Sequence, residues 1–195
     1  MLTVPPFCPE FMARRFLAAN RDWIAGHRPP PPIKFSNGQR LTILGRAVQI
    51  CHDPNCKGTK WIDDCLWVGG EDVFLNRRVT DFIKRKTLAY IGEKAPILAH
   101  KIGCTVHRIT LKDTTSRWGS CSARGNLNFC WRLGMAPLYV LDYIIAHEVS
   151  HLREMNHGPR FWQTVSELCD RRADAEIWLR RHGTELHRLR PASDS

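Results

Sequence analysis

The chain has 195 residues, of which 43% are hydrophobic and 25% are charged. A chain of this length can bury a hydrophobic core without disulfides or metals to stabilise it, and its composition is that of a globular protein, not of a disordered or fibrous one. It contains no run of about 18 uninterrupted apolar residues, so we expect no membrane-spanning helix. The formal net charge of +10, with its basic excess in residues 1–60, favours acidic partners, nucleic acid among them, but no nucleic-acid-binding motif accompanies it.

The N-terminus and the cysteines predict a cytoplasmic protein. The first residues lack the basic start, apolar stretch and small-residue cleavage site of a secretory signal. The eight cysteines are scattered and include no C-x-x-C pair, so reduced, mostly buried thiols are their simplest interpretation. A second zinc site is an alternative that the C-x4-C spacing disfavours; it would use Cys51, His52, Cys56 and Cys65.

Residues 1–32 are predicted to be an N-terminal extension that precedes the folded domain. Phe11 to Trp23 can form a short helix. The run Pro29–Pro32 then forces an extended spacer, because proline fixes the backbone in the polyproline conformation.

The next part of the chain is predicted to be β structure followed by a long helix. Within residues 33–76, Asn37-Gly38 is a strong hairpin signal, and a further strand fits Cys65–Val68. Residues 74–102 favour a helix that Pro96 kinks or restarts. We expect its buried side to carry Phe82, Leu88, Ile91, Ile97 and Leu98.

The second half returns to β structure over residues 104–132 and ends in two helices. The first helix is predicted over 138–155, with Pro137 suited to its first turn, and the second from Pro159 to about Arg181. The order of strands, helix, strands and two helices predicts an α+β fold with a mostly antiparallel sheet packed on the helices. We accordingly divide the chain into the extension 1–32, a domain 33–182 and a polar tail 183–195.

One motif within the first of these helices carries chemistry: H-E-x-x-H at His147, Glu148 and His151. Positions four apart lie one turn above each other on a helix, so two imidazoles can reach one ion. Glu148 is rotated by about 100° from His147. It would therefore lie beside the ion as a general base that takes a proton from a metal-activated water.

The spacing leaves two candidates for the third metal ligand. His157 can reach the ion if the helix ends before it, and Gly158-Pro159 bars helix continuation. Glu154 falls on the face of His147 and His151, where it could be a ligand or an acceptor that orients a histidine. The preference of zinc for nitrogen favours His157, and three histidines would leave the fourth position for water.

Four sequence blocks have a more specific pattern than H-E-x-x-H alone: LTILGR (41–46), RWGSCS (117–122), NLNFCWRL (126–133) and HEVSHLREMNHGPRFW (147–162). Together they resemble the YgjP-like metallopeptidase domain family over about residues 33–182, and SprT-like proteases more distantly. The resemblance implies a compact zincin-like fold. It also implies one zinc ion bound by His147, His151 and His157, a catalytic Glu148, and peptidase or hydrolase activity.

These observations predict a zinc-dependent metallopeptidase whose partner is a peptide or protein substrate. Two alternatives use the same residues differently: a metal-dependent hydrolase of a small amide or nucleotide-type substrate, and a nucleic-acid-binding module with a vestigial metal site. Arg117 could stabilise an oxyanion or pair with an acid elsewhere. Residues 126–131 could be an edge strand that pairs with an extended peptide.

Overall fold

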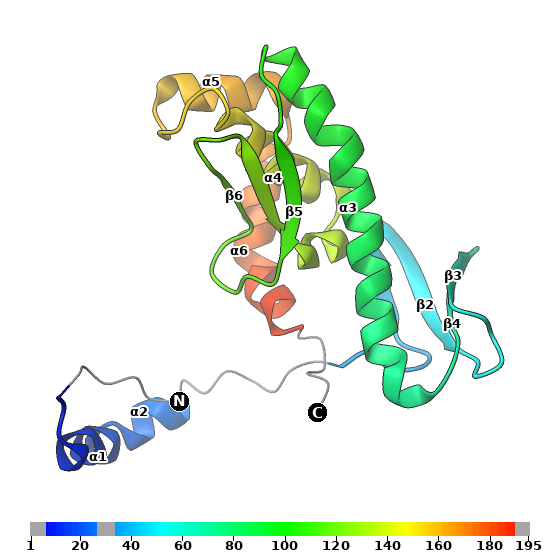
Figure 1. Cartoon of the computed structure of the whole chain (residues 1–195), viewed down its shortest axis with the longest axis vertical. Helices are drawn as coiled ribbons and strands as arrows, with labels where there is room; N and C mark the ends of the chain where they lie inside the picture. Colours follow the sequence, from blue (N-terminus) through cyan, green and yellow to red (C-terminus); the bar gives the residue numbers. More distant parts are fainter. Residues whose placement is uncertain (1–6, 27–33, 190–195) are drawn as a thin grey trace. The chain divides into compact units, whose positions relative to one another are not determined.

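The computed structural model describes residues 7–26 and 34–189 (Figure 1). The chain forms two compact units, residues 1–31 and 32–195. The first unit contains α1 (Glu10–Ala19) and α2 (Arg21–Gly26), where the sequence predicted one short helix. The helices part at Asn20, whose side-chain amide donates to the Phe16 carbonyl and so competes with helix continuation. The predicted spacer Pro29–Pro32 lies outside the described residues.

The second unit begins with a four-stranded sheet in the order β1-β2-β4-β3. Its strands are β1 (Arg40–Ile43), β2 (Arg46–His52), β3 (Thr59–Ile62) and β4 (Cys65–Val68). The β1/β2 and β3/β4 pairs are antiparallel, whereas β2 and β4 are parallel. The predicted strand Cys65–Val68 is confirmed as β4.

The hairpin that joins β1 and β2 turns at Leu44-Gly45, so the prediction of a hairpin at Asn37-Gly38 was wrong. Both Leu44 (φ 48°) and Gly45 (φ 78°) have positive φ, as a two-residue turn of this twist requires. A leucine disfavours that conformation locally, but its backbone N–H donates to the Gly134 carbonyl at 2.8 Å. Asn37-Gly38 instead forms a turn that leads into β1.

A short 3-10 turn, η1 (Asp72–Phe74), leads into α3 (Leu75–Lys101), which confirms the predicted long helix. The helix runs through Pro96 without interruption. Its predicted buried side was partly wrong, because Leu88 and Ile97 are 41% and 58% exposed. Adjacent helix positions point about 100° apart, so only Leu98 of the Ile97-Leu98 pair faces the core. Figure 1 shows α3 running past both sheets, and it contacts β5 of the second sheet as well as β3 and β4.

The second sheet has three strands in the order β5-β7-β6, namely β5 (Arg108–Lys112), β6 (Gly119–Cys121) and β7 (Asn126–Cys130). β7 pairs with β5 in parallel and with β6 antiparallel. β7 is therefore the central strand, and the prediction that residues 126–131 form an edge strand was wrong. Hydrophobic periodicity identifies a strand but does not give its neighbours.

The remaining elements are η2 (Trp131–Met135), α4 (Leu138–Ser150), α5 (Pro159–Leu168) and α6 (Arg172–Arg188). The single helix predicted from Pro159 to about Arg181 is two helices, because Cys169 is extended (φ −152°, ψ 124°). α6 continues to Arg188, and Leu186 within the predicted tail is only 9% exposed. α4 contacts α3, α5, α6 and β6, so it is buried on nearly all sides.

The fold is a mixed helix–sheet fold with small, antiparallel-rich sheets, and this confirms the predicted fold class. Its core lies where α3 packs against both sheets and α4 packs against α3 and β6, around fully buried residues such as Ile91, Leu127, Phe129 and Leu141. Among residues 7–26 and 34–189, no helix combines the length and apolar character that a bilayer crossing requires.

Candidate metal centre

Three imidazole rings meet where α4 gives way to α5. His147 lies in the last turn of α4, His151 is its C-terminal cap, and His157 precedes α5. One nitrogen from each ring lies within 4.8 Å of the other two, and the Nε2 atoms of His147 and His157 are 3.1 Å apart. Of the described residues, only these three form a group that could hold a metal ion.

The local chain explains the convergence. α4 ends at Ser150, earlier than predicted, and the Ser150 carbonyl accepts the N–H groups of both Arg153 and Glu154 as the helix unwinds. Gly158 is extended (ψ −178°) and Pro159 opens α5, so His157 is turned back toward the end of α4. A helix that continued through residue 157 would point this ring elsewhere.

Glu154 contributes through its backbone. His151 donates from Nδ1 to the Glu154 carbonyl at 3.1 Å, which leaves Nε2 of His151 free to face the other rings. The carboxylate of Glu154 is not a member of the group of candidate ligands. Of the two candidates for the third position, the structure therefore places His157 beside His147 and His151, and Glu154 orients a ring.

The donor set fits a divalent ion such as zinc. Burial is the main cause that lowers the pKa of His147 to about 4, and the neighbouring His151 and His157 add to it. Burial also lowers the pKa of His151. His147 and His151 are therefore neutral near pH 7, which is the form of histidine that binds metal. His147 also has a buried Nδ1 without a hydrogen-bond partner among the described residues.

Glu148 is buried beside this cluster. The residue is only 5% exposed to solvent, and Oε2 of its carboxylate has no hydrogen-bond partner among the described residues. Burial raises the pKa of Glu148 to about 7, and the positive charge of Arg117 opposes that rise. A buried carboxyl with a raised pKa can exchange a proton near neutral pH.

Two supporting features were not found by sequence reasoning. Gly119 in β6 faces Glu148, because a Cβ there would lie 2.4 Å from Glu148 Oε1; its position in the RWGSCS block was the available signal. Glu176 in α6 accepts hydrogen bonds from Tyr143 at 3.0 Å and from Arg172 at 2.8 Å. This ties α6 to the helix that carries His147.

An aromatic wall backs the three histidines. The Phe161 ring lies 4.9, 4.5 and 4.6 Å, centroid to centroid, from His147, His151 and His157. Trp162 stacks beneath the guanidinium of Arg172, 3.5 Å from ring centre to Cζ. Apolar rings around a site exclude water and limit the motion of its polar groups.

Arg117 is exposed and makes no salt bridge with any residue in the described parts of the chain. Its electrostatic influence on Glu148 is the interaction that its side chain shows. Of the two roles predicted for Arg117, the structure therefore does not show an ion pair with an acidic residue elsewhere.

The alternative second zinc site is not formed. Cys51 and Cys65 face each other across β2 and β4, with their Sγ atoms 2.8 Å apart. The His52 ring is instead engaged with the Gly70 carbonyl through Nε2 at 2.6 Å. Within residues 34–189 no third ligand joins the two thiols at metal-binding distance.

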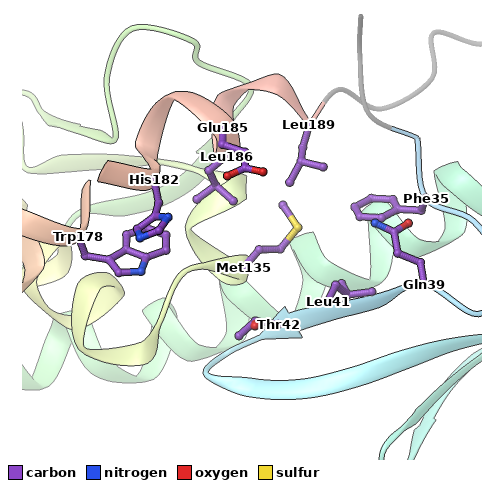
Figure 2. Close-up of a pocket in the computed structure, with 10 residues that line it drawn as sticks. All are labelled: Phe35, Gln39, Leu41, Thr42, Met135, Trp178, His182, Glu185, Leu186 and Leu189. Atoms are coloured by element: carbon purple, nitrogen blue, oxygen red, sulfur yellow. The ribbon is translucent and has the colours of Figure 1, made fainter. Parts of the chain in front are cut away.

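A cavity of about 270 Å³ elsewhere in the second unit is separate from the histidine cluster. Figure 2 shows Trp178, His182 and Glu185 of α6 on one side of it, with Leu41 and Thr42 of β1 opposite. None of the three clustered histidines lines it.

Comparison with known proteins agrees with the geometry. A family model described as YgjP-like, metallopeptidase domain, matches residues 1–182. The matched range includes residues 1–32, which the sequence blocks had left outside the resemblance. No curated protein and no solved structure matches the chain.

Proposed function

The chain belongs to the YgjP-like metallopeptidase domain family, whose name indicates a metal-dependent hydrolase, and on that premise we propose that it is a zinc-dependent peptidase. In this proposal His147, His151 and His157 hold one zinc ion and Glu148 is the general base. The observation that carries it is the convergence of three imidazole nitrogens within 4.8 Å, next to a buried carboxylate.

The ion and the protein have separate tasks. Zinc, when bound, would supply Lewis acidity that polarises a carbonyl and makes water nucleophilic near neutral pH. Glu148 would accept the proton of the attacking water on its carboxylate and return it to the leaving amine nitrogen.

The free edge of β6 supports a peptide as the substrate. Trp118 accepts from the Cys130 N–H at 2.7 Å, and Ser122 donates to the Asn126 carbonyl at 3.0 Å. The backbone N–H and C=O groups of successive strand residues point alternately to the two sides of the strand. Those of Gly119 and Cys121 therefore point away from β7, toward the unpaired side of β6. An extended peptide can add to this edge, and Gly119 would hold it next to Glu148.

The proposal includes a cytoplasmic location. All eight cysteines are free thiols in the structure, as a reducing compartment would maintain them.

The proposal is tested by profiling cleavage sites in a cell extract with the zinc-loaded wild type and with Glu148→Gln. We expect new peptide termini with the wild type alone, and the same zinc content in both proteins. A parallel screen with small amides and nucleotides provides the contrary outcome: turnover of those compounds without peptide cleavage would reject a peptidase and retain a hydrolase.

A further inference from the structure

A second cavity, of about 250 Å³, lies against the three-stranded sheet. Leu127 and Phe129 of β7 are fully buried on one face, so the intervening Asn128 points to the opposite, outer face. There its side-chain amide donates to Ser120 Oγ at 3.2 Å. The lining residues come from all three strands and the loop before β6, and they include Lys112, Arg117, Gly119, Ser120 and Asn128.

The cavity carries an excess of positive charge. Lys112 and Arg117 are exposed, and neither forms a salt bridge within the described parts of the chain. The acid at the rim, Asp113, already pairs with the fully buried Arg132. Lys112 and Arg117 therefore have no salt-bridge partner among the described residues, and they line the same cavity as Ser120 and Asn128.

The loop that carries Arg117 is fixed from within. Thr114 donates through Oγ1 to the Arg117 carbonyl at 2.8 Å, and Cys130 donates through Sγ to the Thr114 carbonyl at 3.4 Å. The cationic groups are thus attached to ordered backbone, and binding an anion requires little further ordering of the chain.

We propose that this cavity binds a carboxylate of the substrate and so sets the cleavage preference of the enzyme for acidic peptides. The inference rests on the proposed peptidase function. The cavity adjoins the candidate metal centre at Gly119, which lines the cavity and also faces Glu148. Side chains of a peptide added to β6 would alternate between the face of α4 and the outer face. A residue next to the reacting bond would therefore point to the cavity.

The chemistry favours a carboxylate over a neutral group. Hydrogen bonds between charged donors and a carboxylate are about twice as strong as neutral ones. Acidic side chains and a free C-terminal carboxylate offer the same group, so the experiment includes both.

The test measures binding without turnover. Full-length Glu148→Gln protein is titrated with acetyl-Ala-Ala-Glu-Ala-Ala-amide, with the same peptide carrying Gln for Glu, and with the Gln peptide bearing a free C-terminus. Amide shifts of Ser120 and Asn128 are followed by NMR, with and without zinc, so that ligation of the carboxylate to the ion is recognised. We expect at least one of the two peptides that carry a carboxylate, the Glu peptide or the Gln peptide with a free C-terminus, to bind about tenfold more tightly than the neutral Gln peptide, with or without zinc.

Matched variants locate the effect. The double change Lys112→Gln and Arg117→Gln should abolish the preference. The control is Arg108→Gln, which removes an exposed cation from the same face of β5 at a position that does not line the cavity and should retain the preference.

Equal affinity for all three peptides, or a preference that survives the double change, would overturn the inference. So would loss of the preference in the Arg108 control, which would indicate general attraction to a basic surface. None of these results depends on hydrolysis, so the proposed function would be judged separately by its own cleavage assay.

Discussion

Gly119 of β6 and Glu148 of α4 are in such close apposition that a Cβ on residue 119 would stand 2.4 Å from Glu148 Oε1. Real Cβ atoms do not approach other heavy atoms so closely, so any side chain there must displace the carboxylate or the strand. The glycine thereby links the geometry of the free sheet edge to that of the proposed general base.

Gly119→Ala should therefore lower kcat by about 100-fold, since a misplacement near 1 Å can cost that much, while zinc content stays unchanged. The matched control is Gly92→Ala on the exposed side of α3, where a Cβ meets nothing within 4 Å. That change should leave activity intact and stabilise the helix by about 1 kcal/mol. Wild-type kcat in Gly119→Ala would show that the close approach does not constrain Glu148.

Glu148→Gln should abolish hydrolysis, retain zinc and stabilise the metal-free protein. The wild-type carboxylate is buried and its Oε2 lacks a partner among the described residues. A neutral amide would cost less to bury, by about 1–2 kcal/mol. Urea unfolding of the metal-free proteins measures the difference.

Glu176→Gln provides the opposite case to Glu148→Gln. Glu176 accepts from both Tyr143 and Arg172, so loss of its charge should destabilise the fold by about 1 kcal/mol. If both substitutions shifted unfolding in the same direction, the contrast between an unpartnered and a partnered carboxylate would be contradicted.

Tyr90 should make stability fall in alkaline solution. Its hydroxyl is hydrogen-bonded to Asp142 at 2.7 Å, and burial, followed by that bond, raises the pKa of Tyr90. A raised pKa contributes stability that is present below the ordinary tyrosine pKa of about 10 and is lost as pH rises above it. Melting temperatures from about pH 8 to 12 should thus fall more steeply in the wild type than in Tyr90→Phe. Parallel curves would count against this linkage.

Features that depend on neighbouring residues could be predicted from the sequence. The four-residue spacing of His147 and His151 places two rings one turn apart on any helix. Gly158-Pro159 bars helix continuation, so the chain between His151 and His157 had to turn. Such local rules place the side chains but do not test their chemistry. The roles of the three histidines as metal ligands and of Glu148 as general base are still predictions.

Features that depend on distant segments could not be predicted in this way. Gly119 and Glu176 reach the site from a strand and a helix that no periodicity connects to α4. The place of β7 between β5 and β6 follows from pairing, which hydrophobic alternation does not specify. At Leu44 a hydrogen bond to Gly134 overrides the local preference that had suggested Asn37-Gly38 for the hairpin.

The most direct measurement is the zinc content of purified wild type, His157→Ala and Glu154→Gln, with X-ray absorption of the wild-type metal. The three-histidine site predicts one zinc per wild-type chain with nitrogen neighbours at roughly 2.0–2.1 Å. It also predicts loss of zinc in His157→Ala and full occupancy in Glu154→Gln. Full zinc occupancy in His157→Ala, or loss of zinc in Glu154→Gln, would contradict the site.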